Sequence, residues 1–285
     1  MTFELRRDGL IRLCAFPTRA LGWAVPLWAT LCGAIASDGF SLTLTDGVRL
    51  LLTFLLLEAG WGTLWAALAT TDWAAALRRW PDRPAGRTRF LPYTQPASPA
   101  GRLARWLAQL RFWWASADGS FRRALAAVIA SLCCSLLLAA VLGLSLFLLT
   151  ALAMSLMELA LVLDRGRGQV GAGWDAVLRL GLPWLAGHLA FAAPALPTVA
   201  LATTFSLAVA GIDRSDRSGG RALWTGGQGI AALFLVLLQR PLAVPFLTLL
   251  LLPQLLLAGW DKEGRWPAHA WPWLAAAMLL AAWAL

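Results

Sequence analysis

Charged side chains are scarce in this chain. Only 14% of its 285 residues are Asp, Glu, Lys or Arg, whereas 59% are apolar; ordinary soluble domains have about 25% charged residues. A soluble domain with so large an apolar fraction would lack the charged residues that cover a surface, so the composition excludes one. The sequence also lacks a P-loop, the motif that binds nucleotide phosphates, and a nucleophile elbow, the motif that presents the catalytic serine of α/β-hydrolases.

Cysteine and lysine are rare as well. The four cysteines (Cys14, Cys32, Cys133 and Cys134) lie in or beside apolar runs without metal-ligand spacing. We interpret them as small packing residues. Lys262 is the one lysine among 24 basic residues, and such a preference for arginine is typical of a GC-rich bacterial genome.

Long uncharged stretches are abundant. A membrane crossing requires about 20 mainly apolar residues, and backbone inside hydrocarbon must satisfy its own hydrogen bonds, which favours helices. The sequence therefore predicts an all-α fold, a polytopic membrane helix bundle that forms one domain over residues 1–285. We predict about nine crossings, at roughly 20–37, 48–70, 124–142, 145–163, 176–193, 195–212, 222–239, 241–258 and 270–285.

Three breaks separate neighbouring crossings. The run 124–163 contains Glu158 as its one charged residue, and as a single helix it would be about twice as long as the hydrocarbon is thick. It must fold back, and Gly143 with Ser145 is the predicted turn. The other breaks are predicted at prolines, at Pro194 with Pro197 and at Arg240-Pro241.

The basic residues indicate the orientation. Of the 24 Lys and Arg residues, 22 fall on one side of a bundle with nine crossings, which leaves Arg49 and Arg240 for the other side. Because basic loops stay in the cytoplasm, we predict a cytoplasmic N-terminus, a C-terminus outside, and location in the bacterial inner membrane. This asymmetry accounts for the net charge of +9, so a nucleic-acid partner is not needed to explain the charge. Membrane lipids are the predicted partners.

The longest hydrophilic segment, 71–123, is predicted to be a cytoplasmic loop. Its first part is too rich in Pro, Gly and Arg for a helix. Its second part predicts an interfacial amphipathic helix over about 102–115, which lies against the headgroups as a lipid-anchored lid without chemistry. Arg102, Arg105 and Gln109 lie on its polar face, and its apolar face contains Leu103, Trp106, Leu107, Leu110 and Trp114.

Glu58, Glu158 and His188 are ionisable residues that fall inside predicted crossings. A carboxylate in hydrocarbon usually faces the bundle interior and has a partner. Glu58 is interpreted either as hydrogen-bonded to a neighbouring Ser or Thr or as lining a ligand cavity, and Glu158 as reaching Arg165 or Arg179. His188 is a candidate ligand of a haem or chlorin metal, although a single interhelical hydrogen bond is the favoured interpretation.

Two stretches near the predicted cytoplasmic face carry a family resemblance. Arg87 to Leu107 (RTRFLPYTQPASPAGRLARWL) follows the second predicted crossing, and Gly211 to Leu223 (GIDRSDRSGGRAL) follows the sixth. With nine crossings, a long 2–3 loop and a shorter 6–7 loop, the chain resembles the UbiA superfamily of intramembrane prenyltransferases. The first stretch is similar to the residues after the family's first motif, and the second resembles its second motif.

The resemblance implies a mechanism. In this family, aspartates at the cytoplasmic ends of helices 2 and 6 hold Mg²⁺, which bridges the oxygens of a prenyl diphosphate and neutralises charge as diphosphate leaves. The allylic cation then meets an acceptor in an apolar chamber that excludes water. Carried over, this implies Asp72, Asp213 and Asp216 as metal ligands and Arg217 or Arg221 as the diphosphate contact.

The sequence departs from the family at both motifs. The first motif has four polar positions, and three of them are occupied here by Leu64, Trp65 and Leu68. Asp72 alone keeps a polar ligand at the fourth position. Apolar side chains cannot coordinate a hard cation. In the second motif Gly220 replaces the third aspartate, and the two that remain are flanked by arginines. Ordinary ion pairs in a solvated loop are therefore favoured over metal binding.

Three hypotheses for function follow. The favoured one is a UbiA-like protein without prenyltransferase activity, which acts with other integral membrane subunits as a lipid-, quinone- or pigment-binding subunit or an assembly factor. The alternative is an active Mg²⁺-dependent prenyltransferase that moves a polyprenyl group to a quinone, chlorin or lipid acceptor. A small-molecule transporter is the third, but the sequence lacks the internal repeat of many transporters.

Overall fold

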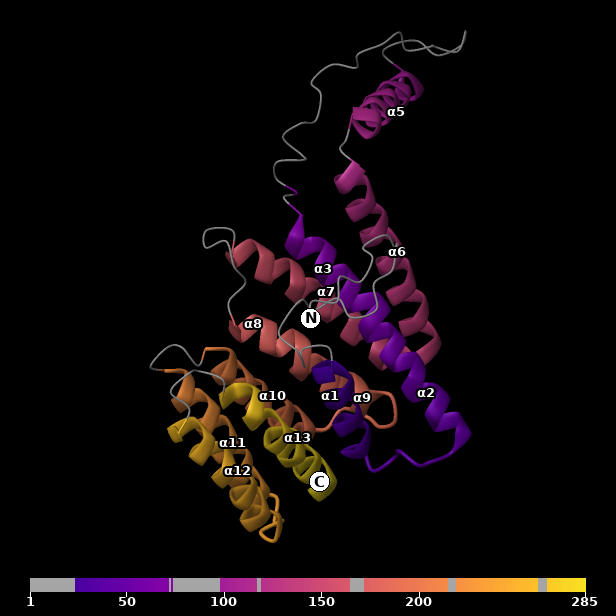
Figure 1. Cartoon of the computed structure of the whole chain (residues 1–285). Coiled ribbons are helices and arrows are strands. Elements are labelled where there is room, and N and C mark those ends of the chain that lie inside the picture. The colour runs from indigo at the N-terminus through magenta and orange to yellow at the C-terminus, as the bar shows by residue number, and fades with distance from the viewer. Residues whose placement is uncertain are drawn as a thin grey trace.

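Helices joined by short turns make up the part of the chain that the structure describes (Figure 1). This computed structural model describes residues 24–71, 73, 98–116, 119–164, 172–214, 219–260 and 266–285. No strand occurs in these ranges. The all-α prediction is therefore confirmed for them.

The elements are single helices and two composite rods. In each rod a π-helical segment, whose hydrogen bonds span one residue more than those of an α-helix, joins two α-helices without a break. The first rod consists of α2 (Leu44–Leu55), η1 (Leu56–Gly62) and α3 (Thr63–Thr70), and the second of α8 (Ala172–Ala176), η2 (Val177–Gly181) and α9 (Leu182–Leu189). The single helices are α1 (Ala24–Ile35), α5 (Pro99–Ser116), α6 (Gly119–Leu142), α7 (Leu144–Asp164), α10 (Leu196–Asp213), α11 (Gly220–Leu237), α12 (Ala243–Trp260) and α13 (Trp266–Ala284).

Each of the nine ranges predicted as crossings contains helical residues. Among the described residues, five helices are long and apolar enough to cross a membrane: Leu44–Ala69, Gly119–Leu142, Leu144–Leu163, Leu196–Asp213 and Ala243–Trp260. The helix α1 is apolar but shorter. The structure is thus a helix bundle with several helices suited to a membrane, whereas the number nine and the direction of the termini stay predictions.

The three predicted breaks are confirmed. Gly143, between α6 and α7, has a φ of +120°, a left-handed conformation that glycine adopts without steric cost. The turn between α9 and α10 contains Pro194, and the turn between α11 and α12 contains Arg240 and Pro241. The helix α9 ends at Leu189 and α11 ends at Leu237, shortly before these prolines. Proline lacks the backbone N–H that a continued helix would need, which favours a break here.

Two apolar clusters form the core, and the rod α8–η2–α9 takes part in both. One cluster joins this rod to α1, α10, α11, α12 and α13, and the other joins it to the rod α2–η1–α3, α6 and α7. Figure 1 shows α6 and α2 on one side of the molecule and α11 and α12 on the opposite side. Side chains on α8–η2–α9 are therefore placed between the two halves of the bundle.

The helices α1 and α9 cross in backbone contact. A Cβ built on Gly33 of α1 would lie 1.9 Å from the carbonyl oxygen of Trp184, and one built on Gly187 of α9 would lie 2.0 Å from the carbonyl oxygen of Thr30. No side chain fits at either position without moving the helices apart. Small residues at a crossing let membrane helices approach this closely, and here they fix the central rod against α1.

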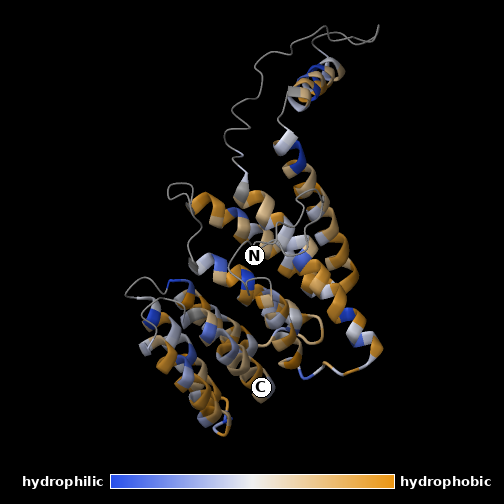
Figure 2. Cartoon of the chain, viewed as in Figure 1, coloured by the Kyte–Doolittle hydropathy of each residue, from blue (hydrophilic) through white to orange (hydrophobic). Residues whose placement is uncertain are grey.

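The outer helices keep large apolar side chains on their surfaces. Leu137 and Val141 of α6 and Phe246 and Leu249 of α12 are exposed. Figure 2 shows both helices as hydrophobic along most of their length. Such a surface suits lipid or neighbouring membrane helices rather than water.

Candidate functional site

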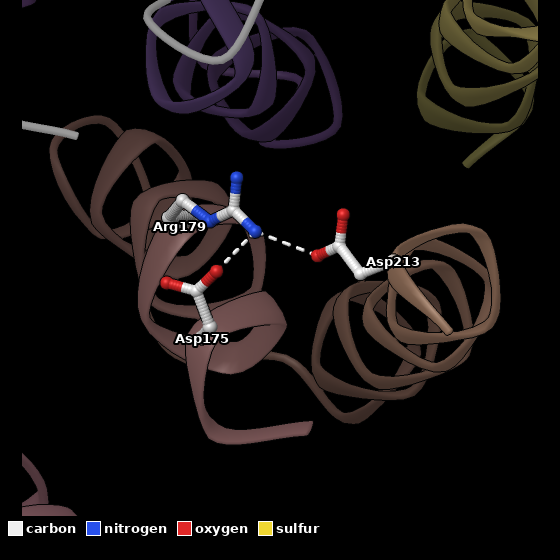
Figure 3. Close-up of polar contacts among 3 residues, drawn as sticks. All are labelled: Asp175, Arg179 and Asp213. Atoms are coloured by element: carbon white, nitrogen blue, oxygen red, sulfur yellow. Dashed lines mark hydrogen bonds and ion pairs between the residues drawn. The ribbon is translucent and has the colours of Figure 1, made fainter. Parts of the chain in front are cut away.

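Two aspartates bind a buried arginine where the central rod meets α10 (Figure 3). The side chain of Arg179 comes from η2, and the residue is only 5% exposed. Its Nη2 forms an ion pair with Oδ2 of Asp175 and donates a hydrogen bond of 2.6 Å to Oδ2 of Asp213. We call these three residues the Arg179 cluster. It links α8–η2 to the last residue of α10.

Local structure explains why these three side chains converge. Asp175 and Arg179 are four residues apart on one rod, so they lie on the same helix face. Gly181 lets α10 approach the rod closely, because a Cβ there would lie 2.8 Å from Oγ of Ser206. Asp213 ends α10, where the partial negative charge of the helix C-terminus disfavours a carboxylate and favours a neighbouring cation. Arg179 supplies that cation.

The cluster holds more negative than positive charge when both carboxylates are ionised. Burial raises the pKa of Asp175 above its usual range, because desolvation disfavours the charged form. The guanidinium of Arg179 opposes this rise, and the charge of Asp213 adds to it. Asp175 lies just before the predicted crossing 176–193, so the cluster lies at the N-terminal end of that crossing.

The residues implied by the family resemblance fall partly outside the described residues. Asp72, Asp216 and Arg217 lie outside them, and their predicted roles in metal and diphosphate binding stay predictions. Asp213 belongs to the Arg179 cluster. Arg221 is exposed in the first turn of α11.

The central part of this cluster was not predicted from the sequence. There, Arg179 counts among the basic loop residues and is a candidate partner of Glu158, and Asp175 is not a candidate. The spacing of four residues between Asp175 and Arg179 was the available signal, since it pairs opposite charges along a helix. Glu158 itself is exposed on α7.

The positions that match the family's first motif lie in the apolar core. Leu64 and Trp65 are only 4% and 5% exposed and belong to the cluster around α6 and α7. Leu68 packs against the same cluster. These side chains therefore fill space between helices, in addition to lacking oxygen atoms.

Glu58 is buried in η1, so each rod carries a buried ionisable residue in its π-helical segment. Such segments are frequent at functional sites. In the described structure the buried Nε1 of Trp61 and Oγ of Ser135 have no hydrogen-bond partner. Ser135 lies against this segment, because a Cβ on Gly60 would be 2.3 Å from its Oγ. Polar atoms are thus buried around η1, and the predicted role of Glu58 in ligand binding stays a prediction.

His188 uses both ring nitrogens within the protein. Its Nε2 lies 3.0 Å from the carbonyl oxygen of Ala193, and its Nδ1 lies 3.3 Å from Oγ1 of Thr198 in α10. With the proton on Nε2, the ring donates to Ala193 and accepts from Thr198. The interhelical hydrogen bond favoured from the sequence is present, and the geometry gives no support to the predicted cofactor role.

The described donors do not make a Mg²⁺ site. Among the residues that the structure describes, no group of three or more His, Cys, Asp or Glu side chains is placed to hold a metal ion. Mg²⁺ requires near-octahedral oxygen ligands. In the Arg179 cluster, one oxygen of each carboxylate already contacts the guanidinium.

Comparison with known proteins identifies no relative: no protein-family model, curated protein or solved structure matches this chain. The resemblance to the UbiA superfamily therefore rests on the sequence alone. The geometry of the Arg179 cluster and of the first-motif positions is the remaining basis for a functional proposal.

Proposed function

We propose that this chain is a UbiA-like membrane protein without prenyltransferase activity, which binds a lipid, quinone or pigment as a subunit or assembly factor of a larger membrane complex. The observation that carries the proposal is the contact between Asp213 and Arg179. The resemblance implies Asp213 as a metal ligand, yet a buried guanidinium already binds its carboxylate. A cation fixed in the chain supplies the charge that a metal would bring, and it repels a second cation.

The first-motif positions support the same proposal independently. Leu64 and Trp65 are core residues of a different rod, so the absence of carboxylates there does not depend on Arg179. A diphosphate carries about three negative charges, and its departure requires a cation that spreads them. The first-motif positions on one rod lack oxygen ligands. On the other rod, Arg179 already binds Asp213, so neither place offers a cation site.

Two buried polar groups around η1 support the ligand-binding part of the proposal. The indole N–H of Trp61 and the hydroxyl of Ser135 are buried, and a buried donor without an acceptor costs about 1–3 kcal/mol. A ligand with a carbonyl or hydroxyl head and an apolar tail would satisfy such groups. Quinones and oxygenated pigments have this chemistry, and the exposed faces of α6 and α12 offer area for partner helices.

We also infer nine crossings, a cytoplasmic N-terminus and location in the bacterial inner membrane. Helices in each predicted range support the first inference, and the distribution of the 24 basic residues supports the second. The Arg179 cluster then lies at the cytoplasmic end of the bundle.

The proposal predicts no enzymatic release of diphosphate. Purified protein in detergent, incubated with labelled prenyl diphosphates, Mg²⁺ and quinone, chlorin or lipid acceptors, is expected to release no more diphosphate than the protein-free mixture. Asp213→Asn is expected to leave this background unchanged. Glu158→Gln, at an exposed carboxylate, is the matched control. Mg²⁺-dependent release that Asp213→Asn abolishes and Glu158→Gln preserves would establish the prenyltransferase alternative.

A further inference from the structure

The helix α5 lies outside the bundle, beside the first turn of α6 (Figure 1). Trp113 of α5 packs against Phe121 of α6 with ring centroids 5.3 Å apart, and Trp73 packs against the same ring at 5.4 Å. The contact between Trp113 and Phe121 holds α5 against the start of α6. Because α6 is long and apolar enough to cross a membrane and begins at Gly119, α5 lies at the end of a candidate membrane helix.

The apolar face of α5 is left uncovered in the part of the chain that the structure describes. Leu103 is 58% exposed, and Trp106 and Leu107 are each 49% exposed. With Trp114, which is also exposed, they repeat at helical spacing and share one face. A row of large apolar side chains at this place is suited to the boundary between headgroups and acyl chains.

Arginines surround this apolar face. At 100° per residue, Arg102 and Arg111 fall at its two edges and Arg105 falls behind it. Arg122 and Arg123 add two more guanidinium groups in the first turn of α6, and all five arginines are exposed. Asp118 is the one acidic residue in 98–123, so this stretch carries a net charge of +4. The surface therefore combines an apolar strip with a strong positive charge.

We propose that α5 and the first turn of α6 form a binding surface for anionic phospholipid headgroups. The apolar strip enters the interface, and the arginine stems follow it while their guanidinium groups bind lipid phosphates. A zwitterionic membrane satisfies only the apolar strip, whereas an anionic one adds attraction for each arginine. The proposal is independent of the proposed function, because it involves no residue of the Arg179 cluster.

Hydrogen exchange of the full-length protein in lipid nanodiscs tests this proposal. Amides of 98–116 are expected to exchange at least about tenfold more slowly in discs that contain phosphatidylglycerol than in discs of phosphatidylcholine alone. The triple variant Arg102→Gln/Arg105→Gln/Arg111→Gln is expected to lose this difference. Arg240→Gln, which removes an arginine from the turn between α11 and α12, is the control and is expected to retain it.

Each other outcome overturns the proposal. Equal exchange in the two kinds of disc, or a difference that survives the triple variant, would show that the arginines do not select anionic lipid. Protection that appears in detergent only when another protein is added would assign the surface to a protein partner. Added salt is expected to weaken the lipid effect, because exposed charges are screened.

Discussion

Arg179→Met is expected to lower the free energy of unfolding by about 3 kcal/mol. The substitution keeps an unbranched apolar stem but removes the cation between Asp175 and Asp213. Breaking a buried ion pair is costly because the remaining charge is left uncompensated. We place the value at the lower end of the usual range, since the two aspartate side chains retain 23% and 31% exposure to solvent.

The pH dependence separates this electrostatic effect from a loss of packing. Without Arg179 the two carboxylates repel each other, so the folded variant binds protons more readily than the unfolded chain. The deficit relative to wild type should therefore shrink as pH falls. Unfolding in detergent at several pH values measures it, and Arg221→Met, at an exposed arginine of α11, is the matched control. Equal stability of the two variants at neutral pH would argue against the cluster.

Trp65→Asp is expected to have the largest effect, a loss of about 4 kcal/mol or more. The substitution introduces the aspartate that the family resemblance places at this position. Because Trp65 is a buried core residue, the change leaves a cavity and buries a carboxylate among apolar side chains. We expect the variant to aggregate or to purify in very low yield.

Two controls make the Trp65 result interpretable. Trp65→Phe keeps an aromatic ring and is expected to fold. Trp260→Asp makes the same chemical change at a 79% exposed tryptophan, and it is expected to have little effect on the unfolding midpoint or on elution from a gel-filtration column. A folded Trp65→Asp protein with wild-type stability would instead place this residue in a hydrated mouth and would revive the metal-site interpretation.

Much of the fold could be predicted from the sequence because its signals are local. Uncharged runs predicted helices in the correct places, and a run too long for one crossing required the turn now seen at Gly143. The prolines at 194 and 241 marked the correct breaks, because the effect of proline on backbone hydrogen bonding is local. The amphipathic pattern of 102–115 predicted α5 for the same reason.

The Arg179 cluster could not be predicted in the same way. Its link to Asp213 joins residues 34 positions apart, and it depends on how closely α10 packs against the central rod. The π-helical segments around Glu58 and Arg179 also gave no recognisable pattern, because one extra residue in a helical turn needs no particular side chain. The direction of the Leu64 and Trp65 side chains became clear only from their packing in the core.

Calorimetric titration of the wild-type protein with Mg²⁺, in the presence of a non-cleavable prenyl diphosphate analogue, tests most directly whether an arginine has taken the place of the metal. With Asp213 bound to Arg179, no saturable, stoichiometric heat of Mg²⁺ binding is expected. Stoichiometric binding by the wild type that Asp213→Asn eliminates would contradict this account.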